Sequence, residues 1–220
     1  SIFTPIIVMS IVVAVTFLFT GPVITGISLG LAEGLQILLS WNAAIFGGII
    51  AGLYQILVIF GLHWGIIPIY VNDFAVLGYS YLSAIVSFSI VGQAGAALGV
   101  AVKSKKPKIK ELGYAGTISA FCGITEPAIY GINLRFRRPF IAASIGSAVG
   151  GFFTGLLRVN MWSIIGSIIG LPSYIDPEAG INSNFWYAVM ITILTLVVSF
   201  LITYFWGYND EMKMQQKREK

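Results

Sequence analysis

The stretch "KSKKPKIKELGYAGTISAFCGITEPAIYGINLRFRR", residues 103–138, places a moderately apolar segment between two basic clusters. The clusters, "KSKKPKIK" at 103–110 and "RFRR" at 135–138, both favour the cytoplasmic side of a membrane, where lysine and arginine accumulate. If 112–134 crossed the bilayer, three arginines would be left on the outer side. The segment is therefore predicted to dip into the membrane and return as a re-entrant hairpin, which is tolerated only where protein or a water-filled cavity surrounds it.

The composition of the whole chain supports a membrane location. Of its 220 residues, 57% are hydrophobic and 10% are charged, and the mean hydropathy is +0.88. Soluble domains carry about 25% charged residues, so this sequence indicates an integral membrane protein. The net charge of +4 is concentrated in a few clusters, and this distribution predicts no nucleic-acid-binding stripe.

Five apolar segments approach the roughly 20 residues that a helix needs to cross a bilayer core. They are 3–23, 43–62, 82–102, 139–157 and 185–206. The positions of the basic clusters predict that 43–62 and 82–102 run in opposite directions across the membrane. The expected fold class is an all-α integral membrane protein with about five transmembrane helices, an interfacial amphipathic helix and one or two re-entrant hairpins.

The remaining segments complete this arrangement. Apolar and polar residues alternate at helical spacing over 24–41, which predicts an amphipathic helix in the membrane interface; a weakly hydrophobic span is the alternative. The stretch 159–184 is expected to form an external cap or a second hairpin. The predicted divisions are 1–42, with the first transmembrane helix and the interfacial helix; 43–212, a transport unit containing the hairpin; and 213–220, a basic cytoplasmic tail.

Glu126 is the strongest candidate for a functional side chain, because it lies in the predicted hairpin. A charged side chain near the middle of a bilayer costs about 2.5–3.5 kcal/mol or more, so it usually faces a cavity and has partners there. Thr125 adds a hydroxyl beside it, and Pro127 ends one helix or begins the next. The alternative is that the carboxylate only caps the following helix.

His63, the one histidine, ends a long uncharged helix in "FGLHWG" at 60–65. Its imidazole can donate to and accept from hydroxyls, and the indole of Trp64 can stack on the apolar face of a sugar ring; a structural histidine is the alternative. Gln93 is a weaker candidate, because it equally suits a hydrogen bond between helices. Asp73 is interpreted as ending a helix on the outer side, and Cys122 as a small buried residue.

The sequence shows no catalytic set. It contains no phosphate-binding glycine loop, no metal-ligand spacing and no nucleophile–base arrangement, so no metal and no cofactor are expected. The chain is predicted to bind and move a substrate around 112–134, since transporters bind substrates at broken helices near mid-membrane.

Two stretches carry a resemblance to a known family. "FGLHWGIIPI" at 60–69 and "GQAGAALGVAVKSKKPKIKELGYAGTISAFCGITEPAIYGINLRFRRPFIAASIGSAVGG" at 92–151 together resemble the membrane (IIC) domain of sugar phosphotransferase system (PTS) permeases. The similarity is to the glucose superfamily, in its β-glucoside, sucrose and trehalose branch. It is strong over about 43–160 and loose elsewhere.

The resemblance implies a permease that binds a sugar, such as a glucoside or disaccharide, outside and presents it to a phosphorylated IIB domain at the cytoplasmic face. The glutamate of the "GITEP" motif, here Glu126, would accept hydrogen bonds from sugar hydroxyls, and the histidine of "GLHW", here His63, would lie at the same site. The phosphorylation sites of the IIA and IIB domains are not in the chain, which corresponds to the C-terminal, sugar-binding portion of a longer polypeptide. The resemblance also implies a homodimer in the bacterial inner membrane.

Two other interpretations remain open. One is an ion-coupled secondary sugar transporter in which Glu126 carries a proton. The other is a sugar-sensing membrane subunit that regulates a partner.

Overall fold

The computed structural model describes residues 3–20 and 40–212, together with positions 22, 26, 30, 34, 37 and 38. In this part of the chain the regular structure is helical, apart from two isolated β-bridges. The elements are α1 (Phe3–Val15), η1 (Thr16–Thr20), α3 (Ala43–Ile59), η2 (Leu62–Gly65), α4 (Ile67–Leu77), α5 (Tyr81–Lys103), α6 (Pro107–Phe121), α7 (Glu126–Ala128), η3 (Ile129–Asn133), α8 (Leu134–Phe136), α9 (Arg138–Leu157), η4 (Leu171–Tyr174), α10 (Ser183–Ile202) and η5 (Thr203–Gly207).

The predicted all-α membrane fold is confirmed. Each of the five apolar segments contains a helix. Three helices in the described ranges are long and apolar enough to cross a membrane: α5, α9, and α10 continued by η5. The apolar helices at 3–19, 43–59 and 62–77 are shorter. Most of the predicted interfacial helix, 24–41, and the whole predicted tail, 213–220, lie outside the described residues.

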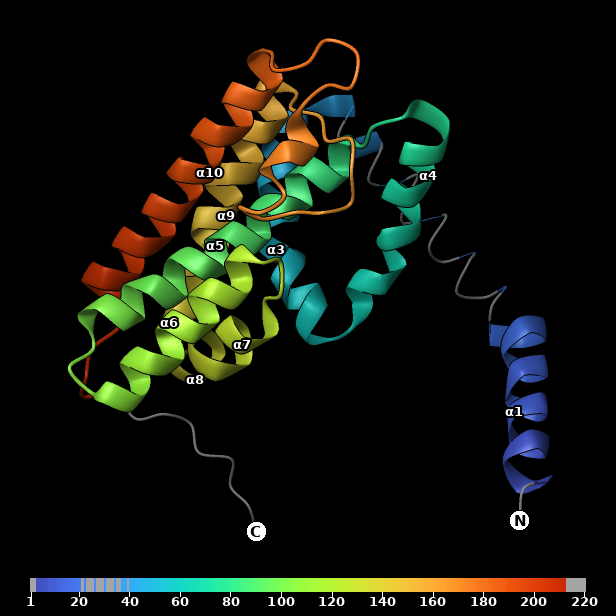
Figure 1. Ribbon diagram of the computed structural model, residues 1–220, viewed down its shortest axis with the longest axis horizontal. Helices are drawn as coiled ribbons and strands as arrows, with labels where there is room; N and C mark the ends of the chain where they lie inside the picture. Colours follow the sequence, from blue (N-terminus) through green and yellow to red (C-terminus); the bar gives the residue numbers. More distant parts are fainter. Residues whose placement is uncertain are drawn as a thin grey trace.

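The helices α3, α5, α9 and α10 form a bundle, and α1 stands apart from it with no buried residue (Figure 1). α5 is the central helix, because 83% of its most apolar window is buried inside the protein. Small residues bring the backbones together, as small residues do at helix contacts in membranes. A Cβ on Gly92 would lie 2.1 Å from Ser147 Oγ of α9, and one on Gly95 would lie 2.6 Å from the Leu196 carbonyl oxygen of α10.

The direction of α3 differs from the prediction. A Cβ on Gly47 would lie 3.5 Å from Ile85 Cδ1 of α5, and eight residues later Gln55 Nε2 donates to Ser89 Oγ of α5 at 3.1 Å. α3 and α5 therefore run in the same direction, and the predicted opposite directions are wrong. The reason is α4, which was not expected as a separate element. The chain turns at Gly61 (φ +72°), and α4 leads back to the start of α5, so that α3 and α4 form a helical hairpin.

The second hairpin is the one expected over 112–134. α6 runs against α5, where a Cβ on Gly113 would lie 2.8 Å from Ala101 Cβ, and against the returning arm, where a Cβ on Gly116 would lie 2.9 Å from Ala128 Cα. The returning arm is α7, η3 and α8 in succession (Figure 1). α6 has 15 residues, a length of about 22 Å, which is shorter than the bilayer core. The hairpin thus has the dimensions that re-entry requires, and its insertion into a bilayer stays a prediction.

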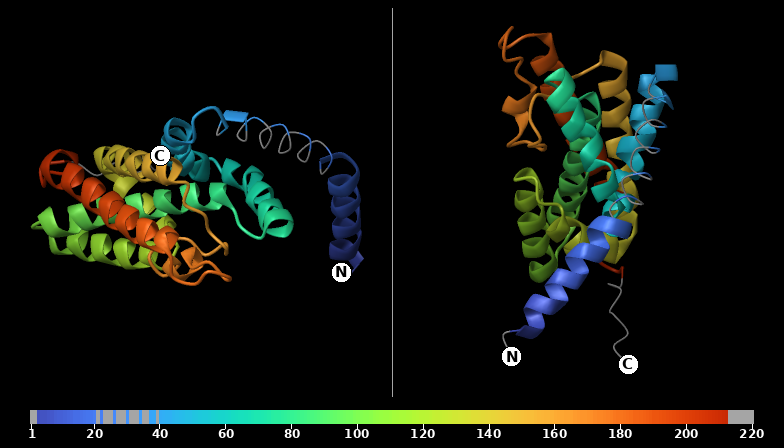
Figure 2. Two further views of the ribbon diagram at one scale, coloured as in Figure 1. Left: turned by 90° about the horizontal axis from the view of Figure 1, so that it is seen from above. Right: turned by 90° about the vertical axis from the view of Figure 1, so that its right-hand side faces the viewer.

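The stretch 158–182, between α9 and α10, is a loop with one short helix, η4. It starts at the end of the bundle where α5 begins, and Met161 forms an antiparallel bridge there with Ser80. It then reaches the end of α6, where Ile169 N donates to the Phe121 carbonyl oxygen at 3.2 Å. The two views of Figure 2 show this loop beside the bundle (orange). It is therefore more than an external cap, because it enters the bundle as far as the second hairpin.

Candidate binding site

Glu126 stands at the turn of the second hairpin. The turn is closed by Ser119, whose hydroxyl donates to the Ile124 carbonyl oxygen at 2.9 Å and whose carbonyl accepts from Ile124 N at 3.0 Å. Gly123 takes a left-handed conformation (φ +92°), which favours glycine, and the next helical turn begins at Glu126. Thr125 is buried and Glu126 is exposed. No hydrogen bond or ion pair to the Glu126 carboxylate is found among the described residues, so it is available to a ligand.

His63 stands at the turn of the first hairpin. The ring is half-buried, with centroid distances of 5.5 Å to Trp64 and 6.4 Å to Tyr54. Its Nδ1 is buried and has no hydrogen-bond partner in the described part of the chain. Buried polar atoms nearly always have a partner, so an unpaired one indicates a group that is satisfied by a ligand or by water. Trp64 is 70% exposed, which leaves its indole free to stack on a ligand.

The two turns reach the same level of the bundle from opposite ends. Gln55 of α3 lies beside Ser89, and Thr117 Oγ1 of α6, which donates to the Gly113 carbonyl oxygen, lies 3.5 Å from the Ala94 carbonyl oxygen. Ser89 and Ala94 are both in the middle third of α5. α3 continues for four residues beyond Gln55, and α6 for four residues beyond Thr117, which is about 6 Å in each case. The turns that carry His63 and Glu126 are therefore both level with the middle of α5, although no hydrogen bond or ring contact joins the two side chains.

Gln93 and Asn133 tie the second hairpin to α5. Gln93 is fully buried, and Asn133 Nδ2 donates both to its Oε1, at 2.8 Å, and to its carbonyl oxygen, at 3.0 Å. Gln93 thus makes the contact between helices that was one of its two interpretations, and Asn133 is the partner that the sequence analysis missed. No local pattern marks Asn133 as this partner, because it lies in the π-helical turn η3 and is fully buried, whereas Glu126 is exposed.

Two further expectations can be compared with the structure. Asp73 lies within α4, where it accepts a hydrogen bond from Ser80 Oγ at 2.9 Å and so joins α4 to the first turn of α5. Cys122 is exposed, so the expectation that it is buried is wrong. The hairpin turn projects this side chain outward instead of packing it against α5.

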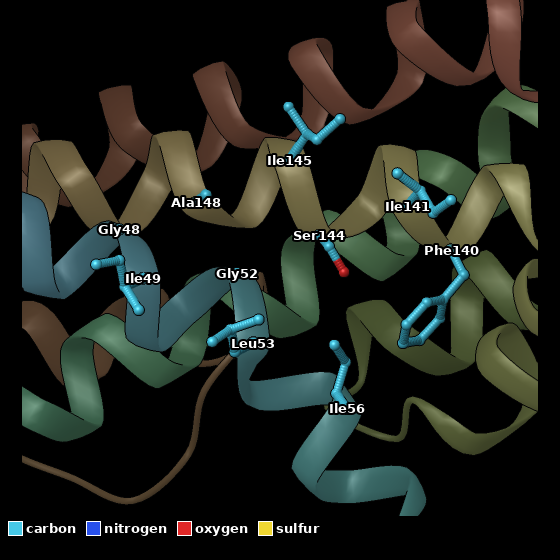
Figure 3. Close-up of a pocket in the computed structure, with 10 residues that line it drawn as sticks. All are labelled: Gly48, Ile49, Gly52, Leu53, Ile56, Phe140, Ile141, Ser144, Ile145 and Ala148. Atoms are coloured by element: carbon cyan, nitrogen blue, oxygen red, sulfur yellow. The ribbon is translucent and has the colours of Figure 1, made fainter.

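An apolar groove of 460 Å³ lies between α3 and α9 (Figure 3). Its only polar side chain is Ser144, and the others come from residues such as Ile49, Leu53, Phe140 and Ile145. A polyhydroxylated ligand needs a partner for most of its hydroxyl groups, and this groove offers one. The groove is therefore chemically unsuited to a sugar, and the hairpin turns remain the better candidate.

The comparisons with known proteins agree with the resemblance in the sequence. The family described as "Phosphotransferase system, EIIC" matches residues 1–147. The chain belongs to this family. The PTS system beta-glucoside-specific EIIBCA component of Dickeya chrysanthemi is 38% identical over 93% of this chain and 32% of its own length. The sucrose-specific EIIBC component of Bacillus subtilis is 36% identical over 74% of the chain and 36% of its own length.

A third EIIC relative, the N-acetylmuramic acid-specific EIIBC component of Vibrio parahaemolyticus, is 34% identical over 95% of the chain and 44% of its own length. The chain thus spans about a third to less than half of the length of these PTS relatives. No solved structure matches it. The PTS family assignment agrees with the apolar helices of the chain, and the sugars in the relatives' names belong to those relatives.

Proposed function

We propose that the chain is the sugar-binding part of the membrane component (IIC) of a phosphoenolpyruvate-dependent sugar PTS permease. The observation that carries the proposal is the pair of hairpin turns level with the middle of α5. Among the described residues, the Glu126 carboxylate in one turn and the His63 Nδ1 in the other have no hydrogen-bond partner. A hydroxyl group can donate to either acceptor, or accept from the imidazole in its other tautomer. Such a pair is suited to the hydroxyl groups of a sugar.

The proposed contacts follow from the positions of the five candidate residues. Glu126 accepts hydrogen bonds from hydroxyls, His63 exchanges one with a further hydroxyl, and Trp64 stacks on a ring face. Thr125 is buried beside the turn, and Gln93 is buried in α5. We assign both a supporting role around the sugar. The relatives' names support a glucoside or a disaccharide as the substrate class.

A phosphorylated IIB domain is the proposed partner at the cytoplasmic face, since several relatives are EIIBC or EIIBCA components. Its docking end would be the end of the bundle with Lys103, 105–110 and 135–138, where basic residues cluster. A homodimer in the bacterial inner membrane, surrounded by lipid, completes the proposal. Transfer of the phosphoryl group would trap the sugar inside, so transport needs no ion gradient.

The test is sugar uptake into membrane vesicles from cells that express the protein together with its PTS partners. Methyl β-glucoside, sucrose and N-acetylmuramic acid would be supplied with and without phosphoenolpyruvate, and with a protonophore. We expect phosphoenolpyruvate to be required, the product to be a sugar phosphate, and the protonophore to have no direct effect. Uptake that does not depend on phosphoenolpyruvate and is abolished by the protonophore would support an ion-coupled transporter. Sugar binding without any flux would support a sensor.

A further inference from the structure

Ser167, in the loop between α9 and α10, is held at the end of α6. Its side chain is 2% exposed, and its Oγ lies 2.5 Å from the Ala120 carbonyl oxygen and 3.0 Å from that of Phe121. The hydroxyl has one proton, so it donates chiefly to Ala120 and shares the proton with Phe121. On its other side, Ser167 N donates to Ser87 Oγ of α5 at 3.0 Å. One residue therefore joins the loop, α5 and α6.

The acceptors are groups that a helix cannot satisfy by itself. The last four carbonyl groups of an α-helix lack partners within the helix, and α6 ends at Phe121. Ala120 O also accepts from Gly123 N at 3.0 Å, within the turn that leads to Glu126. The Ser167 hydroxyl thus binds the same carbonyl that closes the hairpin turn, and the distance along the chain from Phe121 to Glu126 is only five residues.

The backbone conformation of Ser167 is unusual for a serine. Its φ is +77°, a conformation that glycine adopts easily and other residues seldom do. Gly166 and Gly170 are close by, so glycine is common in this segment. A serine at such a position carries a backbone strain that glycine would avoid, which points to a use for its hydroxyl.

We propose that Ser167 is a positioning residue, which fixes the end of α6 and thereby the depth and orientation of Glu126. This inference rests on the proposed function, because Glu126 is taken to bind the sugar. Ser167 itself does not touch the sugar. It sets sugar affinity through the hairpin, and it couples the loop between α9 and α10 to the second hairpin.

The decisive variant is Ser167→Gly, in the protein in detergent or vesicles. Glycine suits the backbone conformation, so the variant keeps the fold and loses only the hydroxyl. We expect the dissociation constant for methyl β-glucoside, or for whichever sugar the uptake test selects, to rise about threefold to tenfold, the range expected for one lost hydrogen bond. The matched control is Ser173→Ala, which removes a hydroxyl that donates to Ile165 O within the same loop and should leave the affinity unchanged.

A second readout reports the hairpin directly and needs no sugar. Cys122 is the one cysteine in the chain, it is exposed, and it lies in the turn that Ser167 holds. We expect a maleimide to react with Cys122 faster in Ser167→Gly than in the wild type, and at the wild-type rate in Ser173→Ala. Ser87→Ala removes the acceptor of Ser167 N and should likewise raise the dissociation constant for the sugar and speed the labelling of Cys122. It replaces Ser167→Gly in both measurements if that variant does not fold.

The two readouts separate the inference from the proposed function. Unchanged labelling in Ser167→Gly, or faster labelling with unchanged sugar affinity, would overturn the positioning role. If the wild-type protein bound none of the sugars, the proposed function would fail, and labelling of Cys122 alone would then decide whether Ser167 holds the hairpin.

Discussion

Replacing Gly151 with alanine tests the close packing of α9 on α3, the helix that leads to His63. A Cβ at this position would lie 2.2 Å from the Gly47 carbonyl oxygen and 2.5 Å from Ala51 Cβ. The two helices would have to separate by about 1 Å to restore contact distances. One contact is with the backbone of α3 and the other with a short side chain, and neither can rotate away.

Overpacking of this kind costs about 1–3 kcal/mol. For a chain of this length, 1 kcal/mol corresponds to about 2–4 °C in melting temperature, so Gly151→Ala should lower it by about 2–12 °C. Because the turn with His63 would move with α3, sugar affinity should fall as well. The assay is a tryptophan fluorescence melt of the purified protein in detergent, with wild type and variant heated at one rate.

The matched control is Gly131→Ala in the second hairpin, where a Cβ would meet no atom within 4 Å. Alanine in a helix is favoured over glycine by about 0.5–1 kcal/mol, so this control should melt at or slightly above the wild-type temperature. A Gly151→Ala variant as stable as the wild type would refute the packing of α3 on α9, and with it the placement of the first hairpin.

Asn133→Leu removes the donor to the buried Gln93 Oε1 and should destabilise the protein by about 1–3 kcal/mol; the double variant with Gln93→Leu should be more stable than Asn133→Leu alone, and a double variant that is less stable would contradict the pairing. Asp210→Asn weakens the link between the ends of α5 and α10, because the Asp210 carboxylate accepts from Lys105 N at 3.0 Å and from Ser104 Oγ at 3.0 Å. The backbone N–H of Lys105, followed by the other hydrogen bonds, lowers the pKa of the Asp210 carboxyl below its ordinary value. A carboxyl group whose pKa is lowered on folding stabilises the protein at pH values above the pKa of the unfolded state, about 3.9. This stabilisation is lost as the pH falls through the pKa of the folded state. Melting curves from pH 7 to pH 3 should show Asp210→Asn below the wild type at pH 7 and the two converging under about pH 4, whereas a constant difference would mean that ionisation of Asp210 plays no part.

The sequence predicted the second hairpin because charge topology is a strong constraint. Three arginines at 135–138 and the lysines of 103–110 had to share one side, and only a returning segment allows that. The turn, and Glu126 within it, followed from this single argument. The first hairpin was missed because 63–81 contains few charges that would fix its side of the membrane. Its turn depends on Gly61, and a glycine in an apolar stretch does not show whether a helix ends there.

Long-range partners were beyond the reach of the sequence. Ser167 lies in "IIGSIIG" at 164–170, where nothing marks one serine for a contact with α6. The pairing of Asn133 with Gln93 depends on how the hairpin packs on α5. Local patterns indicate elements and turns, whereas contacts 40 or more residues apart are decided by packing.

The most direct test of the central claim is sugar binding by Glu126→Gln. The substitution keeps the shape of the side chain and removes its charge, and Glu126 is exposed without a protein partner among the described residues, so stability should not change. Hydrogen bonds to a charged acceptor contribute about 1.5–3 kcal/mol, which predicts a rise of about 10-fold to 100-fold in the dissociation constant. Glu111→Gln, an exposed acid on the other arm of the same hairpin, is the matched control and should bind as the wild type does. Calorimetric titration of the three proteins with the transported sugar decides the matter: a large loss confined to Glu126→Gln is the predicted result, and equal affinities in all three would contradict the account.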